Sequence, residues 1–199
     1  MVISENKLKT QLCEVSRRLY KRRLITARGG NVSARLAGRD KFWITGSQTD
    51  KFQVLPNDLV KVSLSGHKIS GMRDSSIETP FHSAVYRRRK DVNAIVHAHN
   101  PITMALTFAK VTVEPLTVEA KYYLKKIGKV RYAEPGSKAL ADQVGKHIAR
   151  TNVLILDGHG VVGVGSDLVE AEHLVELLEE AAITQFASCL VRERRNVQV

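Results

Sequence analysis

Several features are scarce in this sequence of 199 residues, and each scarcity excludes a class of protein. The only two cysteines, Cys13 and Cys189, cannot form a disulfide framework, so we expect buried thiols in a reducing compartment. No apolar run approaches the ~20 residues that a membrane span requires, so we expect no membrane partner. The first residues are polar and predict no signal peptide, which favours a cytoplasmic location.

Positive charge is abundant, whereas aromatic residues are few. The 31 lysines and arginines exceed the 20 acidic residues and give a formal net charge of +11. The basic residues form short runs at Lys21–Arg23, Arg87–Lys90 and Arg192–Arg195, and none of these runs is interleaved with aromatic side chains. An aromatic content of 6% is too low for a base-stacking surface. We interpret the runs first as solvated helix faces and second as a sign of anionic substrates, and we do not expect nucleic acid as a partner.

Helical and strand patterns alternate along the chain with no linker or repeat, which predicts a single domain over 1–199. Capping signals and apolar spacing predict helices that begin at Ser4, Thr79, Pro101, Ser137 and Ser166. Alternating or apolar runs predict strands over 31–36, 41–45, 59–70 (a hairpin), 93–99 and 153–165 (a strand pair). This order predicts an α/β fold in which helices cover both faces of a mixed sheet.

The segment AIVHAHN (94–100) places two histidines at the end of an apolar run. Side chains alternate along a strand, so His97 and His99 point the same way and lie within ~7 Å of each other. The pair suits a metal site. Taken alone, it is explained at least as well by one exposed histidine and one hydrogen-bonded core histidine.

Three further segments bear on this choice. His159 lies between glycines in DGHG (157–160), where core packing does not explain it, although a turn histidine in solvent does. Glu78 precedes the predicted helix start at Thr79 and suits either a helix cap or a proton-transfer group beside a metal, whereas we interpret His82 as a packing residue. The glycine-rich turn ARGGNVS (27–33) offers backbone donors to an anion.

Together, the segments GGNVSARL, FWIT, PNDLVKVSLSG, SSIETPFHSAVYRRRKDVNAIVHAHNP and LDGHGVVGVGSDLVEA resemble the class II aldolase/adducin family, in the family's order and over nearly the whole chain. The resemblance implies a three-layer α/β/α sandwich with a central, mostly antiparallel mixed sheet. It also implies one zinc ion per subunit, held by His97, His99 and His159, with Glu78 as the catalytic group beside the metal.

The same resemblance implies the reaction. A zinc-dependent aldolase cleaves a ketose to an aldehyde and an enediolate whose negative charge the ion stabilises. The expected substrate is a sugar or sugar phosphate, with a ketose 1-phosphate such as L-fuculose 1-phosphate, which yields dihydroxyacetone phosphate, as the leading choice. The positions that match the family's phosphate contacts are Gly30, Asn31, Ser47 and Ser76. A homotetramer is the implied assembly.

The chain departs from the family pattern at three places. Ile77 replaces the second of two serines before the glutamate, and TGSQ (45–48) replaces a Thr-Pro-Thr-Gly-like turn. Both changes remove hydrogen-bond donors to a phosphate, so the sequence leaves open whether the substrate is a phosphorylated or a free sugar. The family's tyrosine near the C-terminus is missing. In the family a second tyrosine comes from a neighbouring subunit, and the residues that could take its role here are Glu119, Tyr122 and Tyr123. A sugar-phosphate dehydratase or epimerase and a non-enzymatic adducin-like module remain the alternatives.

Overall fold

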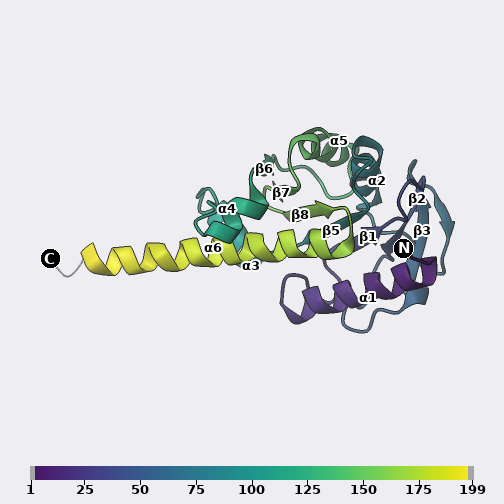
Figure 1. Ribbon diagram of the computed structural model, residues 1–199, viewed down its shortest axis with the longest axis horizontal. Helices are drawn as coiled ribbons and strands as arrows, with labels where there is room; N and C mark the ends of the chain where they lie inside the picture. The colour runs from purple at the N-terminus through teal and green to yellow at the C-terminus, as the bar shows by residue number, and fades with distance from the viewer. Residues whose placement is uncertain (1–2, 197–199) are drawn as a thin grey trace.

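The computed structural model describes residues 3–196, with side chains described as far as Arg192, and contains one eight-stranded sheet with the strand order β4-β3-β2-β1-β5-β8-β7-β6 (Figure 1). Every neighbouring pair is antiparallel except β6 and β7. The expected mixed, mostly antiparallel sheet is therefore confirmed. The strands are β1 (Asn31–Ala34), β2 (Lys41–Thr45), β3 (Leu59–Ser63), β4 (Lys68–Ser70), β5 (Ala94–Ala98), β6 (Ile127–Val130), β7 (Val153–Leu156) and β8 (Gly160–Gly165).

Helices cover both faces of this sheet, which makes the three layers of an α/β/α sandwich (Figure 1). One layer contains α1 (Glu5–Lys21), α3 (Pro101–Phe108), α4 (Val118–Leu124) and α6 (Leu168–Asn196). The other layer contains α2 (Thr79–Arg88) and α5 (Lys138–His147). Two short 3₁₀ turns, Pro56–Asp58 and Ile148–Arg150, precede β3 and extend α5.

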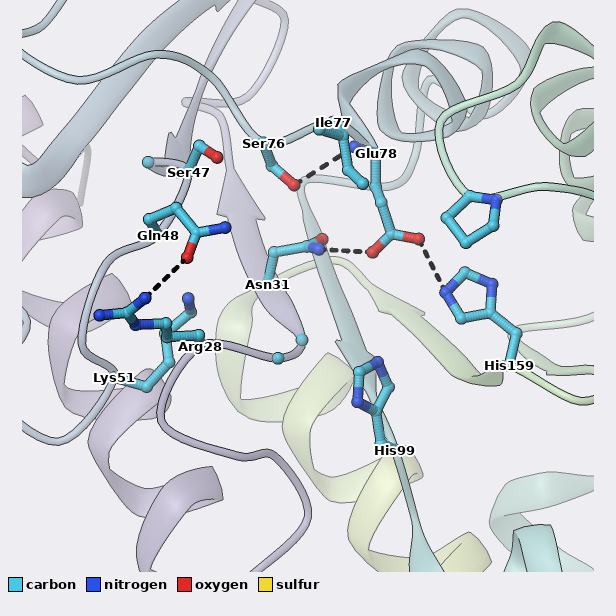
Figure 2. Close-up of a pocket in the computed structure, with 14 residues that line it drawn as sticks. Arg28, Asn31, Ser47, Gln48, Lys51, Ser76, Ile77, Glu78, His99 and His159 are labelled. Atoms are coloured by element: carbon cyan, nitrogen blue, oxygen red, sulfur yellow. Dashed lines mark hydrogen bonds and ion pairs between the residues drawn. The ribbon is translucent and has the colours of Figure 1, made fainter.

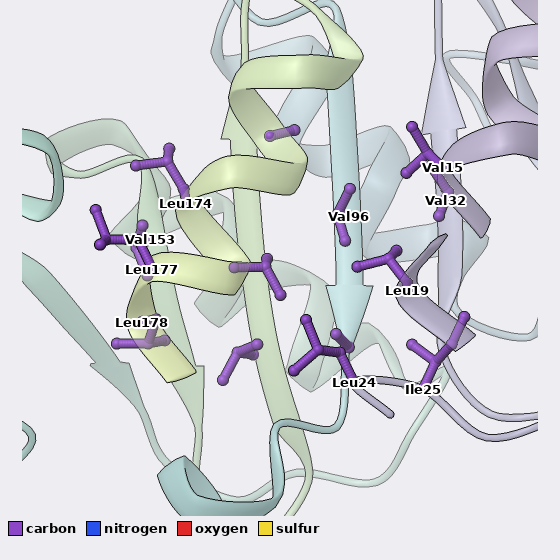
Figure 3. Close-up of a cluster of buried hydrophobic side chains, with 14 of the residues drawn as sticks. Val15, Leu19, Leu24, Ile25, Val32, Val96, Val153, Leu174, Leu177 and Leu178 are labelled. Atoms are coloured by element: carbon purple, nitrogen blue, oxygen red, sulfur yellow. The ribbon is translucent and has the colours of Figure 1, made fainter. Parts of the chain in front are cut away.

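Each layer buries its own apolar cluster against the sheet. Alternate residues of a strand face opposite sides, so Val96 of β5 lies in the cluster under α1 and α6, whereas Ile95 lies in the cluster under α2 and α5. Figure 3 shows the first cluster, in which Leu19 of α1 and Leu174 of α6 pack over the central strands. Burial of these faces on both sides fixes the central strands from which the site is built.

The predicted helix starts agree closely with the structure. Ser4 Oγ accepts the backbone N–H of Lys7 and caps α1, as its position predicts. Asp167 Oδ1 accepts the N–H of Glu170, which is one half of the expected capping box before α6, whereas the Glu170 carboxylate accepts the N–H of Ser166 and not that of Asp167. The prediction at Thr79 is one residue late, because Glu78 occupies the N-cap position of α2.

The structure differs from the sequence-based expectations at Cys189 and adds two elements that were not expected. Cys189 is exposed, unlike the buried Cys13, because it lies on the outer part of α6, where no layer covers the helix. The sequence patterns gave no sign of α4 and β6, which are short and only partly apolar. Lys21–Arg23 is an exposed basic run as expected, whereas the side chains after Arg192 lie outside the described residues. Among residues 3–196, no helix combines the length and apolarity that crossing a membrane would take.

Candidate metal and substrate site

The three central strands bring the candidate residues together. In the antiparallel register Asn31 of β1 lies opposite His97 of β5, and His97 lies opposite Val162 of β8 on its other side. The tight turn from β7 into β8 carries His159 to the same end of the sheet, where His99 follows the last residue of β5. Asn31, His97 and His159, which are 62 to 128 positions apart along the chain, therefore meet at one end of the central strands.

The three histidines form a cluster that has the dimensions of a metal site. One nitrogen from each of His97, His99 and His159 lies within 4.8 Å of the others. His97 is fully buried, whereas His99 and His159 are partly exposed. The geometry brings together the three residues that the sequence singled out.

The hydrogen bonding of His97 favours a cation at this point. The Val161 carbonyl lies 3.0 Å from Nδ1 and can only accept, so Nδ1 carries the proton of the neutral ring. The unprotonated Nε2 then faces Glu78 Oε2 at 3.1 Å and His99 Nε2 at 3.2 Å. A lone pair and a carboxylate oxygen repel each other at this distance unless a cation or a proton lies between them. Three imidazoles with a free side suit a divalent ion such as zinc.

Glu78 lies beside this cluster and does not cap its helix. Its side chain makes no capping hydrogen bond to α2, which removes the structural explanation that its position suggested. Oε1 lies 3.0 Å from His159 Nε2, and Oε2 accepts from Asn31 Nδ2 at 2.7 Å. Burial raises the pKa of this carboxyl, but positive charge at the histidine cluster and the hydrogen bonds from His159 and Asn31 outweigh burial and hold the pKa below its usual value. Glu78 is therefore an ionised carboxylate at neutral pH.

Burial also keeps His97 and His99 neutral, as metal ligation requires. Desolvation lowers the pKa of His99 to about 4, with His97 and His159 adding to the effect. It also lowers the pKa of His97, although Glu78 opposes the shift. His159 Nδ1 is buried and has no hydrogen-bond partner in the part of the chain that the structure describes.

Two glycines make room for this arrangement. A Cβ on Gly160 would collide with the Ala98 carbonyl oxygen and approach both the His97 and the His99 ring to 3.0 Å. Gly30 has φ +69°, in the left-handed region, and a Cβ there would lie 2.8 Å from the His97 carbonyl oxygen. Larger side chains at either position would displace the histidine strand.

A cavity of about 330 Å³ opens over the cluster and contains most of the predicted site (Figure 2). All the predicted residues line it except His97, which lies fully buried behind it: Gly30, Asn31, Ser47, Ser76, Glu78, His99 and His159. Figure 2 shows Glu78 and His159 at one side and Ser47 at the other, with Asn31 between them. Ser76 Oγ accepts the backbone N–H of Glu78 at 3.3 Å, and Ile77 stands beside it in the lining.

The cavity is also lined by three long polar side chains that the sequence analysis did not assign to the site: Arg28, Gln48 and Lys51. Arg28 donates to Gln48 Oε1 at 3.4 Å, and Lys51 Nζ donates to the Thr49 carbonyl at 3.1 Å. Lys51 is only 2% exposed, and burial lowers its pKa to about 8, with a smaller opposing effect from Asp50. No local pattern distinguishes this lysine from the many others. The tyrosine candidates Tyr122 and Tyr123 lie on α4 and do not line the cavity.

Comparison with known proteins finds relatives that are named as aldolases and decarboxylases. Residues 10–186 match the family model "Class II Aldolase and Adducin N-terminal domain". An L-fuculose phosphate aldolase of Methanocaldococcus jannaschii is 38% identical over 93% of this chain and 99% of its own length. A 3-oxo-tetronate 4-phosphate decarboxylase of Cupriavidus necator is 32% identical over 90% of this chain and 83% of its own.

Solved structures have the same fold. The L-fuculose-1-phosphate aldolase of Thermus thermophilus superposes with a TM-score of 0.85 at 30% identity, covering 95% of this chain and 97% of the other. A putative aldolase/epimerase/decarboxylase of Klebsiella pneumoniae gives a TM-score of 0.87 at 29% identity, covering 93% and 91%. The match extends over nearly the whole chain in both sequence and structure. The protein therefore belongs to the class II aldolase and adducin family.

Proposed function

We propose that this protein is a divalent-metal-dependent aldolase, with zinc as its preferred ion, that reversibly cleaves a ketose 1-phosphate to dihydroxyacetone phosphate and an aldehyde. The observation that carries the proposal is the cavity itself. Three imidazoles and a carboxylate converge at one side, and two cationic side chains, Arg28 and Lys51, line it as well.

His97, His99 and His159 would hold one ion per subunit through their ring nitrogens. Three neutral ligands leave the charge of such an ion largely uncompensated and leave a position free for substrate. When bound, the ion supplies Lewis-acid stabilisation of the negative charge that develops on the substrate oxygens. The Val161 carbonyl fixes the tautomer of His97, so the Nε2 lone pair stays available for ligation.

Glu78 is the proton carrier in this proposal. In the condensation direction the ionised carboxylate removes a proton from the hydroxymethyl carbon of dihydroxyacetone phosphate, the resulting enediolate attacks the aldehyde carbonyl, and the protonated Glu78 gives the proton to the alkoxide that forms. In the cleavage direction the ionised Glu78 takes the proton of the ketose hydroxyl as the carbon–carbon bond breaks and returns it to the hydroxymethyl carbon. Burial and the hydrogen bond from Asn31 keep the carboxylate at the cluster.

The remaining polar groups of the cavity suit the anionic end of a substrate. Lys51 is a buried cation that makes one hydrogen bond, to the Thr49 carbonyl, so its other two ammonium hydrogens can serve a phosphate. Arg28, Ser47, Ser76 and the Gly30 backbone add further donors around the same cavity. The Asn31 amide already donates to Glu78, which leaves it one hydrogen for a ligand. These groups replace donors that the chain lacks at Ile77.

The relatives favour a phosphorylated sugar and offer a second candidate reaction. The Methanocaldococcus relative supports L-fuculose 1-phosphate as the leading substrate. The Cupriavidus relative supports decarboxylation of a 3-oxo acid phosphate, in which carbon dioxide leaves in place of an aldehyde. Both reactions break a bond next to a carbonyl and leave the same kind of carbanion, so the same residues can serve either one.

We also propose a homotetramer. The outer part of α6 extends beyond the two layers, and it carries the exposed apolar side chains Ile183, Phe186 and Leu190 (Figure 1). Burial against further copies of the chain would remove this apolar surface from water. Light scattering of the purified protein tests the proposal, and a monomer at micromolar concentration would contradict it.

A substrate screen tests the reaction. Metal-stripped protein is assayed alone and with added zinc, manganese or magnesium against ketose 1-phosphates, free ketoses and 3-oxo-tetronate 4-phosphate. We expect zinc-dependent release of an aldehyde from a ketose 1-phosphate. Metal-dependent release of carbon dioxide alone would replace the aldolase by the decarboxylase, and no turnover of any of these compounds with any of these metals would refute both.

A further inference from the structure

A line of buried polar side chains runs from Glu78 into the core beneath the sheet. Asn31 Nδ2 donates to Glu78 Oε2 at 2.7 Å, and Asn31 Oδ1 lies 2.5 Å from His82 Nε2. His82 Nδ1 lies 2.7 Å from Ser33 Oγ, which lies 2.8 Å from the Tyr86 hydroxyl. All five residues are at most 5% exposed.

The secondary structure explains why these residues meet. Glu78, His82 and Tyr86 are spaced by four and lie on one face of α2, whereas Asn31 and Ser33 are spaced by two and lie on one face of β1. The helix packs across that face of the sheet, so the two polar rows interdigitate. Polar groups in such a place cost free energy unless they are fully hydrogen-bonded, which makes a chance arrangement in an apolar layer improbable on physical grounds.

The chemistry of the groups assigns the direction of each hydrogen bond. A carboxylate only accepts, so the Asn31 amide nitrogen faces Glu78 and its oxygen faces His82. That oxygen only accepts, so His82 Nε2 carries the proton. The ring is neutral because burial lowers the pKa of His82 to about 3, and Nδ1 therefore accepts from Ser33. Ser33 has one hydrogen, so its oxygen accepts from Tyr86.

We infer that His82 is a positioning residue for proton transfer. It fixes the orientation of the Asn31 amide, and the amide holds the Glu78 carboxylate beside the histidine cluster. Ser33 and Tyr86 support this role by selecting the His82 tautomer that donates to Asn31. The inference rests on the proposed role of Glu78, and it replaces the interpretation of His82 as a packing residue. If the amide turned over, its oxygen would face Glu78 and repel it.

The test compares turnover, metal content and stability in matched variants. His82→Phe keeps an aromatic ring against Phe81 but removes the donor to Asn31. Ser33→Ala removes only the support of the tautomer. We expect kcat to fall ~10–100-fold for His82→Phe and less for Ser33→Ala, with the KM for substrate and the zinc content little changed. Ser83→Ala is the control, because this serine is also buried on α2 but has no hydrogen-bond partner among the described residues.

A double-mutant cycle separates positioning from a merely structural role. Glu78→Gln removes the group that His82 serves, so His82→Phe should lower kcat little further in the Glu78→Gln background. Independent, multiplicative losses in kcat would overturn the inference, as would a His82→Phe enzyme with wild-type kcat and a lowered melting temperature. If His82→Phe does not fold, Ser33→Ala and Tyr86→Phe carry the same cycle.

A spectroscopic measurement keeps this test independent of the proposed reaction. In protein labelled with ¹⁵N at histidine, we expect a slowly exchanging Nε2–H signal from His82 that shifts on Asn31→Ala and persists in Ser83→Ala. A His82 protonated at Nδ1 would refute the assigned hydrogen bonds from His82 to Asn31 and from Ser33 to His82, even in an active aldolase. The opposite outcome is also informative. If His82 is protonated at Nε2 but the protein has no activity on any substrate screened, the proposed function is refuted and the hydrogen-bond assignment stands.

Discussion

Replacing Glu78 by glutamine isolates proton transfer from the other interactions of this residue. Glutamine has nearly the same size, and its oxygen can still accept the Asn31 amide, but it cannot take up a proton at neutral pH. The histidine cluster loses no nitrogen, so we expect the zinc content to fall little. The variant therefore tests the carboxylate alone.

We expect a large loss of turnover and a small change in stability. Loss of one general acid–base group costs ~10²–10⁴-fold in rate, or roughly 3–5 kcal/mol of barrier. Stability should change by no more than about 1 kcal/mol, because Glu78 makes no capping bond that the substitution could break.

The assay measures kcat at saturating zinc and substrate, together with metal content and melting temperature. Glu179→Gln is the control, because this buried carboxylate accepts backbone N–H groups of Ile102 and Thr103 away from the cavity. It should lose stability and keep its turnover. A Glu78→Gln enzyme within threefold of wild type on its true substrate would show that another group carries the proton.

Three further predictions concern the ligands, the anion and the glycine turn. His97→Ala combined with His99→Ala should abolish both bound metal and activity while unfolding stays cooperative, as elemental analysis and calorimetry would show; metal retained at one ion per chain would contradict the assignment. Lys51→Met should raise KM ~10–100-fold for a phosphorylated ketose and little for the free ketose. The pKa of Lys51 is about 8, so the wild-type KM should rise as the pH increases above that value, whereas the KM of Lys51→Met should not. Gly160→Ala should weaken zinc binding in a metal titration, because its Cβ would press on His97 and His99; unchanged affinity would mean that the strands move apart at no cost.

Local sequence patterns were sufficient for much of the fold. Apolar spacing and the Ser4 and Asp167 caps predicted α1 and α6, since both signals act between residues a few positions apart. The expectation that His97 and His99 point the same way also needed only strand alternation, and the two ring centroids lie 5.0 Å apart. The weakly apolar α4 and β6 lacked such a signal.

The site depends on contacts between distant segments, which no local pattern contains. Lys51 reaches the cavity because the chain after β2 folds back beside the glycine-rich turn, where its backbone N–H bonds to the Ala27 carbonyl. Tertiary packing likewise turned His82 from an expected packing residue into one whose two ring nitrogens are both hydrogen-bonded.

The sequence by itself determined most of the elements, the layers and the chemical types available: three histidines, one glutamate and a glycine-rich turn, in an order that resembles one family. Only the tertiary structure decided that β1, β5 and β8 lie side by side, so that Asn31, His97 and His159 meet around Glu78. The physical reason is the distance along the chain over which the interactions act. Caps and periodicity are fixed by neighbours along the chain, whereas a buried site is fixed by the burial of two apolar layers, which selects one strand order from many.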